Sequence, residues 1–401
     1  MPTVAVVLPS SSYRAADFVR AAESLGVDLV VASENPPPFD MGDRYLQIDC
    51  RDPVAAANRL ADMGADVGID GVVAADDQGV MVAAHASSIL GLPGNPPDAA
   101  AATRDKLEMR SRLAAAEVDQ PRHVALFPGE SAADAVRSVG APVVIKPRDR
   151  SASQGVIRVD DPERADDVAE RIRDIVADPE ATLVVEEYIA GDEIAIEGLV
   201  EKGELNVLAV FDKPDTGTGP YFPETILVTP SRLPETVLIE AERSAAAAVR
   251  GLGLESGPVH IELKVDDSRA RIIEVAARSI GGLCSRSLNF GLMGTSLETL
   301  ILRNAMNLGK KGLKRETVAS GVLMIPTPAR GVLTSVAGEE ETRAIDGITG
   351  VDFTIRPGED VIPPPEGDRY LGFVYARART PEEVENALRQ AMAEIQVQLE
   401  G

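Results

Sequence analysis

Short apolar runs alternate with amphipathic stretches through the first hundred residues. Buried strands are predicted at Val4–Leu8, Val27–Val31 and Gly71–Ala74. Helical spacing is found between them, as at Ala16–Leu25 and Val80–Leu90. Strands that alternate with helices favour a parallel sheet, because parallel neighbours need a crossover connection. We therefore expect the chain to begin with a domain built around a parallel sheet.

The order of elements changes in the rest of the chain. A buried strand is predicted at Pro142–Pro147 and an amphipathic helix at Pro162–Ala177. Two further apolar runs, within Gly257–Ala276, are separated by Asp266-Asp267-Ser268, a pattern that predicts a β-hairpin. Toward the end, short strands are predicted to precede a final helix at Pro381–Leu399. This mixture is typical of an α+β arrangement.

Each strand of the predicted hairpin carries one glutamate, Glu262 or Glu274. Because side chains alternate across a strand, the two carboxylates can face the same side, where they would need a shared cation such as Mg²⁺. Arg278 follows, and Gly281 and Gly282 would let the backbone approach what the metal holds. The alternative is that these glutamates belong to a solvated outer face.

A lysine ends another buried strand. Lys146 is followed by a loop of small residues that includes Ser151, Ser153 and Gly155. Small residues leave backbone N–H groups free to surround phosphate oxygens, and the lysine would add a positive charge. The alternative is a flexible hairpin loop beside a lysine that extends to solvent.

Acidic residues follow or accompany other predicted strands. Glu193 and Glu197 lie on one face of an alternating strand, which suits either ribose hydroxyls or an exposed strand face. Asp76-Asp77 follow a strand end, where open α/β sheets bind ligands, although a surface turn is the alternative. The Gly- and Pro-rich loop Asp212–Glu224 has the composition of a lid.

Composition limits the classes of partner. The 401 residues carry a formal net charge of −24, which disfavours nucleic acid and anionic membranes over most of the surface. A local basic cleft can still bind a nucleotide. No apolar run has the length of a membrane span, and the two cysteines match no metal or disulfide spacing, so we expect a cytoplasmic protein.

Taken in order, the lysines, the acidic segments and the hairpin resemble the ATP-grasp superfamily over most of the chain. The resemblance implies α/β and α+β multidomain architecture, with a Rossmann-like N-terminal parallel sheet, an ATP-grasp fold and a C-terminal α+β subdomain. The expected boundaries are an N-terminal domain at residues 1–102, a linker helix and small subdomain at 103–190, a large subdomain with the metal site at 191–312, and the C-terminal subdomain at 313–401.

The resemblance also implies residue roles. The lysines would contact phosphates, the segment 186–189 would hold adenine and Glu193 would hold ribose. The implied nucleotide-binding residues are Lys106, Lys146, Ser151, Ser153, Gly155, Glu186, Glu187, Tyr188, Ile189 and Glu193. Glu262 and Glu274 would bind Mg²⁺, and Arg278 with Lys146 would act in catalysis. Substrate contacts are implied at Gly281, Gly282, Glu224 and His260.

The pattern around Glu274 and Arg278 is similar to the L-amino-acid ligase branch. Such an enzyme would use ATP to activate a carboxylic acid, an amino acid in this branch, as an acyl-phosphate and join it to an amine. Two alternatives stay open, a carboxylase-like enzyme that uses bicarbonate and a nucleotide-binding regulatory protein without turnover. His260 would either accept the amine proton or pack the hairpin.

One departure concerns the metal. Many family members have asparagine two residues after the second metal glutamate, where this chain has Ala276. One or two Mg²⁺ ions are therefore expected, with Mn²⁺ as a substitute, and a second ion would be held mainly by phosphate and water. The sequence leaves the oligomeric state open, and the resemblance implies a homodimer only because many family members dimerise.

Overall fold

The computed structural model describes residues 1–10, 12–36, 41–215, 217, 219–266, 269–309 and 312–400. Within them the strands form four sheets. The N-terminal sheet has the order β3-β2-β1-β4, and every pairing in it is parallel. Its strands are β1 (Thr3–Val7), β2 (Asp28–Ser33), β3 (Tyr45–Gln47) and β4 (Gly71–Ala74). The predicted parallel sheet is confirmed.

Helices connect the strands of this sheet, and further helices continue the chain after its last strand. They are α1 (Ala15–Leu25), α2 (Pro53–Val67), α3 (Val80–Leu90), α4 (Pro97–Ala102) and α5 (Lys106–Ala115). Asp105 caps α5, because its carboxylate accepts from the backbone N–H groups of Leu107 and Glu108. The cap fixes Lys106 at the first position of the helix.

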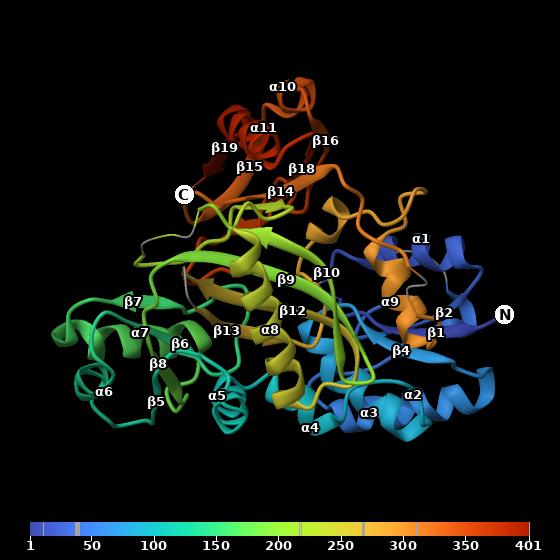
Figure 1. Ribbon diagram of the computed structural model, residues 1–401, viewed down its shortest axis with the longest axis horizontal. Coiled ribbons are helices and arrows are strands. Elements are labelled where there is room, and N and C mark those ends of the chain that lie inside the picture. The colour runs from blue at the N-terminus through green and yellow to red at the C-terminus, as the bar shows by residue number, and fades with distance from the viewer. Residues whose placement is uncertain are drawn as a thin grey trace.

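The small subdomain contains an antiparallel sheet of order β5-β8-β6-β7. Its strands are β5 (His123–Leu126), β6 (Val143–Pro147), β7 (Ile157–Val159) and β8 (Leu183–Glu187), and its helices are α6 (Ala132–Val139) and α7 (Ala165–Val176). One buried apolar cluster joins the helices to the sheet. Figure 1 shows this subdomain and the N-terminal domain at opposite ends of the molecule.

An eight-stranded antiparallel sheet of order β13-β12-β9-β10-β11-β14-β18-β16 lies between them. Its strands are β9 (Asp192–Glu201), β10 (Glu204–Asp212), β11 (Ile226–Thr229), β12 (Ser256–Val265), β13 (Ala270–Ala276), β14 (Ala319–Ile325), β16 (Ile348–Phe353) and β18 (Gly372–Ala378). Helices α8 (Glu235–Leu252) and α9 (Leu297–Ala305) pack against it. Because β11 pairs with β14, the sheet continues across the expected boundary at residue 312.

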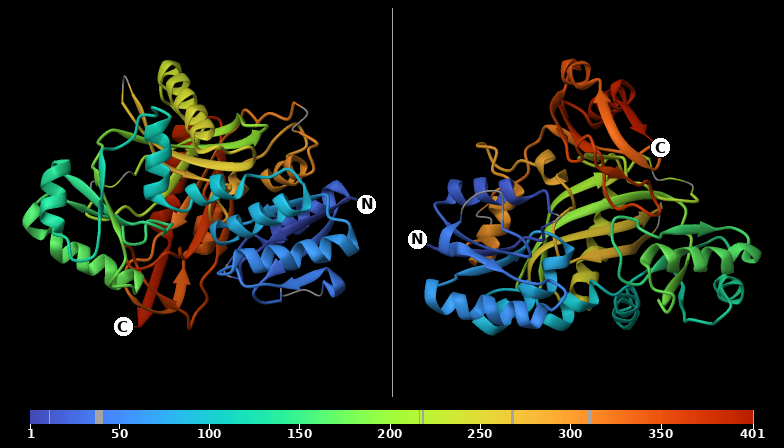
Figure 2. Two further views of the ribbon diagram at one scale, coloured as in Figure 1. Left: turned by 90° about the horizontal axis from the view of Figure 1, so that it is seen from below. Right: turned by 180° about the vertical axis from the view of Figure 1, so that it is seen from behind.

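The C-terminal region adds a three-stranded sheet of order β17-β15-β19 and lies above the centre of the molecule in the right-hand view of Figure 2. Its remaining elements are β15 (Gly331–Ala337), α10 (Glu339–Ala344), β17 (Asp360–Val361), α11 (Pro381–Glu394) and β19 (Gln396–Glu400). The prediction of a helix to Leu399 was wrong. Polar and apolar residues alternate through β19, and this period of two suits a strand that pairs with β15.

The predicted hairpin is formed by β12 and β13, with Glu262 directly opposite Glu274. Its turn residues Asp267 and Ser268 lie outside the described residues. Apolar side chains of β12 and β13 share one buried cluster with those of the N-terminal sheet. The hairpin is therefore held between the two larger parts of the protein. No described helix is both long and apolar enough to cross a membrane.

Candidate active site

A cavity of about 990 Å³ lies where the N-terminal domain, the small subdomain and the eight-stranded sheet meet. Every residue predicted to bind nucleotide, metal or substrate lines this cavity, with the exception of Gly155. These residues come from segments up to 176 positions apart, from Lys106 to Gly282. The fold therefore gathers the candidate residues into one site.

Lys146 is held by an ion pair at the base of the cavity. Its Nζ lies 2.6 Å from Glu186 Oε2, and Arg110 Nε lies 2.8 Å from Glu186 Oε1. Burial alone would raise the pKa of Glu186, but Arg110 and Lys146 outweigh it and hold that pKa at about 2. Both oxygens of Glu186 are thus engaged by cations. Its carboxylate therefore positions Lys146. A ligand bound beside residues 186–189 would contact other atoms of this segment and not the Glu186 carboxylate.

Glu262 and Glu274 each have a lysine partner. Lys106 Nζ lies 3.5 Å from Glu274 Oε1, and Lys213 Nζ lies 3.2 Å from Glu262 Oε1. Lys106 also donates to the Arg150 carbonyl oxygen at 2.5 Å. The two carboxylates face the same cavity from adjacent strands, as the alternation predicted.

Lys213 is a site residue that the sequence analysis did not assign. Besides Glu262, its ammonium contacts Glu193 at 2.5 Å and Glu224 at 2.7 Å. Burial lowers the pKa of Lys213, but the three carboxylates prevail and raise it well above its usual value. The sequence does contain a signal for Lys213. In Phe211-Asp212-Lys213-Pro214 a lysine and a proline follow an apolar run, as Lys146-Pro147 do at the end of their strand.

Two neighbouring residues in the loop after β6 have a left-handed backbone conformation. Ala152 and Ser153 have φ values of 54° and 56°, in the left-handed region that non-glycine residues seldom adopt. Ser151 and Ser153 line the cavity. Gly155 does not, because its N–H donates to the Pro365 carbonyl at 2.8 Å. With a φ of 69° and Pro147 close by, Gly155 closes the turn.

The alternating strand β9 is not an exposed face. Glu197 is fully buried, and its Oε2 lies 3.1 Å from His260 Nδ1 and accepts from the Ile280 N–H at 2.9 Å. His260 Nε2 lies 3.7 Å from Glu262 Oε1. Glu197 and His260 thus connect Glu262 to the segment after Arg278.

Arg278 is held by the N-terminal domain. Its Nε donates to Asp77 Oδ2 at 3.0 Å, and Arg104 Nη1 lies 2.9 Å from Asp77 Oδ1. Burial would raise the pKa of Asp77, but the two arginines outweigh it and lower it to about 2. The surface-turn alternative for Asp77 was therefore wrong. Its carboxylate orients a guanidinium that lies 201 positions away in sequence.

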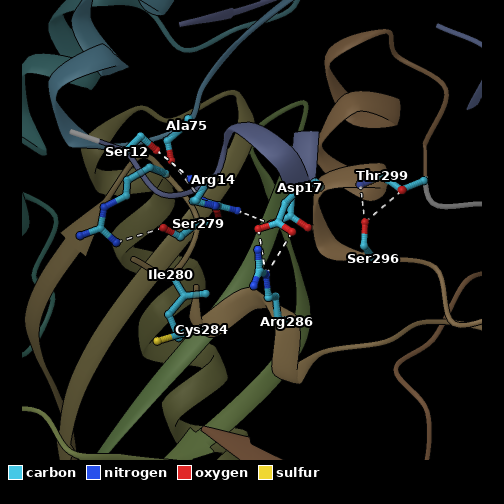
Figure 3. A network of polar contacts seen from close by, with 12 residues as sticks. Ser12, Arg14, Asp17, Ala75, Ser279, Ile280, Cys284, Arg286, Ser296 and Thr299 are labelled. Atoms are coloured by element: carbon cyan, nitrogen blue, oxygen red, sulfur yellow. Dashed lines mark hydrogen bonds and ion pairs between the residues drawn. The ribbon is translucent and has the colours of Figure 1, made fainter. Parts of the chain in front are cut away.

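A second buried arginine holds the residue next to Arg278 (Figure 3). Arg14 is fully buried and donates to the Ala75 carbonyl at 3.1 Å, to Ser279 Oγ at 2.6 Å and to Glu298 Oε1 at 2.6 Å. These contacts join the end of β4, the loop after β13 and α9. The N-terminal domain therefore holds this loop at two adjacent residues, Arg278 and Ser279.

Aromatic side chains lie at two places along the cavity. Tyr188 stacks on Phe222 with 6.4 Å between ring centroids, and both residues line the cavity. Elsewhere, Phe373 packs against Tyr13 and Tyr370 at 6.4 and 6.3 Å. Gly282 approaches the Phe373 ring so closely that an added Cβ would lie 2.6 Å from it. Only glycine fits there without displacement.

The protein side chains suit a metal that arrives with phosphate. Among the described residues, no group of three or more His, Cys, Asp or Glu side chains is placed to hold a metal ion. Glu262 and Glu274 supply two carboxylates, and Mg²⁺ commonly uses one or two carboxylates and completes its shell with phosphate oxygens and water. The pair therefore fits Mg²⁺ bound together with nucleotide phosphates.

Comparisons with known proteins show the family. Family models match as an ATP-grasp N-terminal domain over residues 19–94, an ATP-grasp domain over 139–287 and an L-amino acid ligase C-terminal domain 2 over 323–400. The chain belongs to the ATP-grasp superfamily. The third match extends the likeness to the C-terminal part of this ATP-grasp protein, whose strands complete the central sheet.

This ATP-grasp protein resembles an L-amino acid ligase of Bacillus licheniformis in fold, with a TM-score of 0.82, 24% identity and coverage of 100% of this chain and 99% of that one. It resembles the biotin carboxylase domain of a 2-oxoglutarate carboxylase from Hydrogenobacter thermophilus, solved with MgADP and bicarbonate, with a TM-score of 0.72, 16% identity and coverage of 99% and 90%.

Among curated proteins, alanine–anticapsin ligase of Bacillus subtilis is 31% identical over 236 residues, 53% of this chain and 49% of that protein. The chain thus spans about half the length of this relative. The predicted ATP-grasp architecture is confirmed.

Proposed function

We propose that the protein is an ATP-dependent ligase. It would activate a carboxylic acid, most simply an amino acid, as an acyl-phosphate and couple it to an amine, with release of ADP and phosphate. The observation that carries the proposal is that Lys146, Glu262, Glu274 and Arg278 line one cavity together with Gly281 and Gly282.

ATP would bind across the small subdomain and the eight-stranded sheet. Lys106, Lys146 and the loop containing Ser151 and Ser153 supply the cations and N–H groups that phosphates need. The segment around Tyr188 offers an aromatic face to the base. Glu193 would accept from the ribose hydroxyls. In that state Lys213, which now bridges three carboxylates, would have phosphate oxygens as further partners.

In the first step a carboxylate oxygen of the acid forms a bond to the γ-phosphorus of ATP, and the bond to the bridging oxygen of ADP breaks. These reactants are all anions that repel one another, so the barrier depends on positive charge held in line. Arg278, fixed by Asp77, would stabilise the transferring phosphoryl group, and Lys146 would hold the ATP phosphates. Mg²⁺, held by Glu262 and Glu274, would neutralise phosphate charge.

In the second step the amine nitrogen attacks the acyl carbon, phosphate leaves and the nitrogen loses a proton. Water must be kept from the acyl-phosphate in the meantime. The loop after β6 and the loop from Asp212 to Glu224, of which Thr216 and Thr218 lie outside the described residues, border the cavity and would limit its access to water. Gly281 and Gly282 would place backbone amides beside the acyl-phosphate.

Interception by hydroxylamine tests the proposal. With hydroxylamine in place of the amine, an acid substrate should yield its hydroxamate in amounts equal to the ADP formed. Arg278→Ala should lower both products together, because one cation stabilises their shared transition state. ADP release that depends on bicarbonate, without any hydroxamate, would instead favour the carboxylase alternative. Well-folded, ATP-binding protein that releases no ADP with any acid would favour a regulatory role.

The remaining expectations stay predictions. The substrates are expected to be small molecules, with Mn²⁺ able to replace one or two Mg²⁺ ions. A homodimer can be tested by light scattering, and a cytoplasmic location by cell fractionation.

A further inference from the structure

The start of the loop after β6 is held by α5. The backbone N–H of Lys106 donates to the Arg148 carbonyl oxygen at 2.9 Å, and Lys106 Nζ donates to the Arg150 carbonyl oxygen at 2.5 Å. Ser151 and Ser153, which line the cavity, follow at once. The part of the loop that would meet phosphate therefore begins at a fixed point.

The end of the same loop is held by the C-terminal region. The Gln154 side-chain amide donates to the Glu366 carbonyl oxygen at 2.9 Å, and the Gly155 N–H donates to the Pro365 carbonyl oxygen at 2.8 Å. Both acceptors lie in a turn, residues 363–367, that is closed by its own backbone hydrogen bond of 3.0 Å. The loop is thus anchored at both ends, while residues between the anchors line the cavity.

A charged pair supports the second anchor. Arg171 of α7 donates to Glu366 Oε1 through Nε at 3.1 Å and through Nη2 at 2.5 Å. Its Nη1 donates to the hydroxyl of Tyr221 at 2.6 Å, and Tyr221 lies in the loop from Asp212 to Glu224. One arginine of the small subdomain therefore contacts both the turn 363–367 and a second loop that borders the cavity.

The turn 363–367 is itself attached to the rest of the protein. Shortly after it, the Leu371 N–H donates to the Ile325 carbonyl oxygen of β14 at 3.1 Å, which joins the segment to the eight-stranded sheet. Arg369 Nε donates to the hydroxyl of Tyr13 in the N-terminal domain at 3.2 Å. An anchor on this turn therefore sets the position of the loop after β6 relative to the other walls of the cavity.

We propose that Arg171 and Glu366 are positioning residues for the nucleotide phosphates. The pair would hold the turn 363–367 against the small subdomain, and the turn would hold the end of the loop after β6. The inference rests on the proposed function and adds a part for the C-terminal region in nucleotide binding. Neither side chain lines the cavity, so neither would touch the nucleotide itself.

The anchoring matters because this loop would bind phosphate through its backbone N–H groups. A loop that must be ordered when the ligand arrives loses affinity to the entropy of ordering, whereas a loop already held in place does not. Arg171 and Glu366 are 44% and 30% exposed, and a partly exposed ion pair contributes modestly. The expected effect of the pair is therefore a several-fold change in nucleotide affinity without loss of the fold.

Charge reversal tests the inference. Glu366→Arg places two guanidinium groups side by side and should raise the Kd for a non-hydrolysable ATP analogue about threefold to tenfold, as measured by calorimetry in the presence of Mg²⁺. Hydrogen exchange of the Gly155 amide should become faster, because the turn that accepts its hydrogen bond is released. Adding Arg171→Glu restores a pair of opposite charges and should return both quantities toward their wild-type values.

Glu163→Arg is the matched control. It produces the same charge reversal on the small subdomain, but the ion-pair partner of Glu163 is Arg137 in that subdomain, so the Kd and the exchange rate should stay unchanged. Glu366→Gln is a milder second variant in case the reversal does not fold.

A wild-type Kd and exchange rate in a folded Glu366 variant would overturn the inference. A loss that Arg171→Glu does not restore, or that the control shares, would also overturn it. The proposed function fails separately, if the wild type binds the analogue but forms no hydroxamate with any acid. The Kd and the exchange rate then still decide whether Arg171 and Glu366 position the loop.

Discussion

Replacing Asp77 by asparagine should disorient Arg278 without removing it. The carboxylate accepts from Arg278 on one oxygen and from Arg104 on the other, at 3.0 and 2.9 Å, and the side chain is 15% exposed. Asparagine has the same shape but only one acceptor oxygen, so its NH₂ group would face one of the two guanidinium groups. One charged hydrogen bond is lost and replaced by a contact between donors.

The expected decrease in rate follows from the loss of this one charged hydrogen bond. A hydrogen bond to a charged group contributes about 1.5–3 kcal/mol. If this energy keeps Arg278 in its reactive position, its loss corresponds to about a 10- to 100-fold decrease in kcat, since about 1.4 kcal/mol is a factor of ten. The variant should also lose some stability, because it leaves a buried guanidinium incompletely paired. The KM for ATP should change little, since Arg278 acts on the transferring group.

The assay measures ADP release and hydroxamate formation at saturating ATP, alongside thermal unfolding. Asp17→Asn is a suitable control, because Asp17 also joins the N-terminal domain to an arginine of the central part, Arg286, at 3.1 Å, and neither residue lines the cavity (Figure 3). It should lower stability but leave kcat unchanged. A folded Asp77→Asn variant with kcat within twofold of wild type would refute the reasoning, as would an equal loss in the control.

Further changes probe the rest of the site. Glu274→Gln should lower kcat by about 10²–10³, and near-normal activity at limiting Mg²⁺ would exclude Glu274 as a metal ligand. Lys213→Met leaves Glu224 without its ion-pair partner, while Glu193 keeps Lys264 at 3.1 Å and Glu262 keeps His260 at 3.7 Å. The change should cost about 3–5 kcal/mol of stability. Calorimetry should find a smaller loss with Mg²⁺ and nucleotide bound; an equal loss would argue against a shared site. Gly282→Ala should cost about 1–3 kcal/mol of stability. Gly281→Ala should be tolerated, because a Cβ there would meet no atom within 4 Å. Equal melting temperatures of the two variants would contradict this prediction. The pKa of Glu186 is about 2 in the folded protein, below its usual 4.5. The stability that Glu186 contributes is therefore present above pH 4.5 and lost as the pH falls toward 2. An acid unfolding curve of Glu186→Gln identical to that of the wild type would exclude this contribution.

The parts of the site that could be predicted share one property. Lys146, Glu262 and Glu274 are charged residues within or at the end of apolar strands, where a charge requires a reason. The strand alternation also placed the two glutamates on one face, and the observed register puts them opposite each other. Local sequence was sufficient because each signal lies within one strand.

Other parts depend on contacts that no local pattern encodes. Arg110 lies within α5 and Arg14 directly precedes α1, yet both are fully buried and hold residues far away in sequence. The position of Gly155 outside the cavity lining could not be predicted, because a glycine that closes a turn and one that approaches a ligand look the same in sequence. The strand at Gln396–Glu400 continues an amphipathic helix without a break signal, and pairing with β15 decides its conformation.

The pairing of β11 with β14 makes the C-terminal region part of the sheet that carries the candidate site. Four backbone pairs, from Ile226↔Leu323 to Thr229↔Ser320, connect strands from the two sides of residue 312. A chain cut at that residue would leave β11 as a buried-type apolar edge with unsatisfied N–H and C=O groups, which is a template for aggregation. Exchange of C-terminal regions between such proteins would therefore have to preserve a strand register, and a flexible linker could not replace that junction.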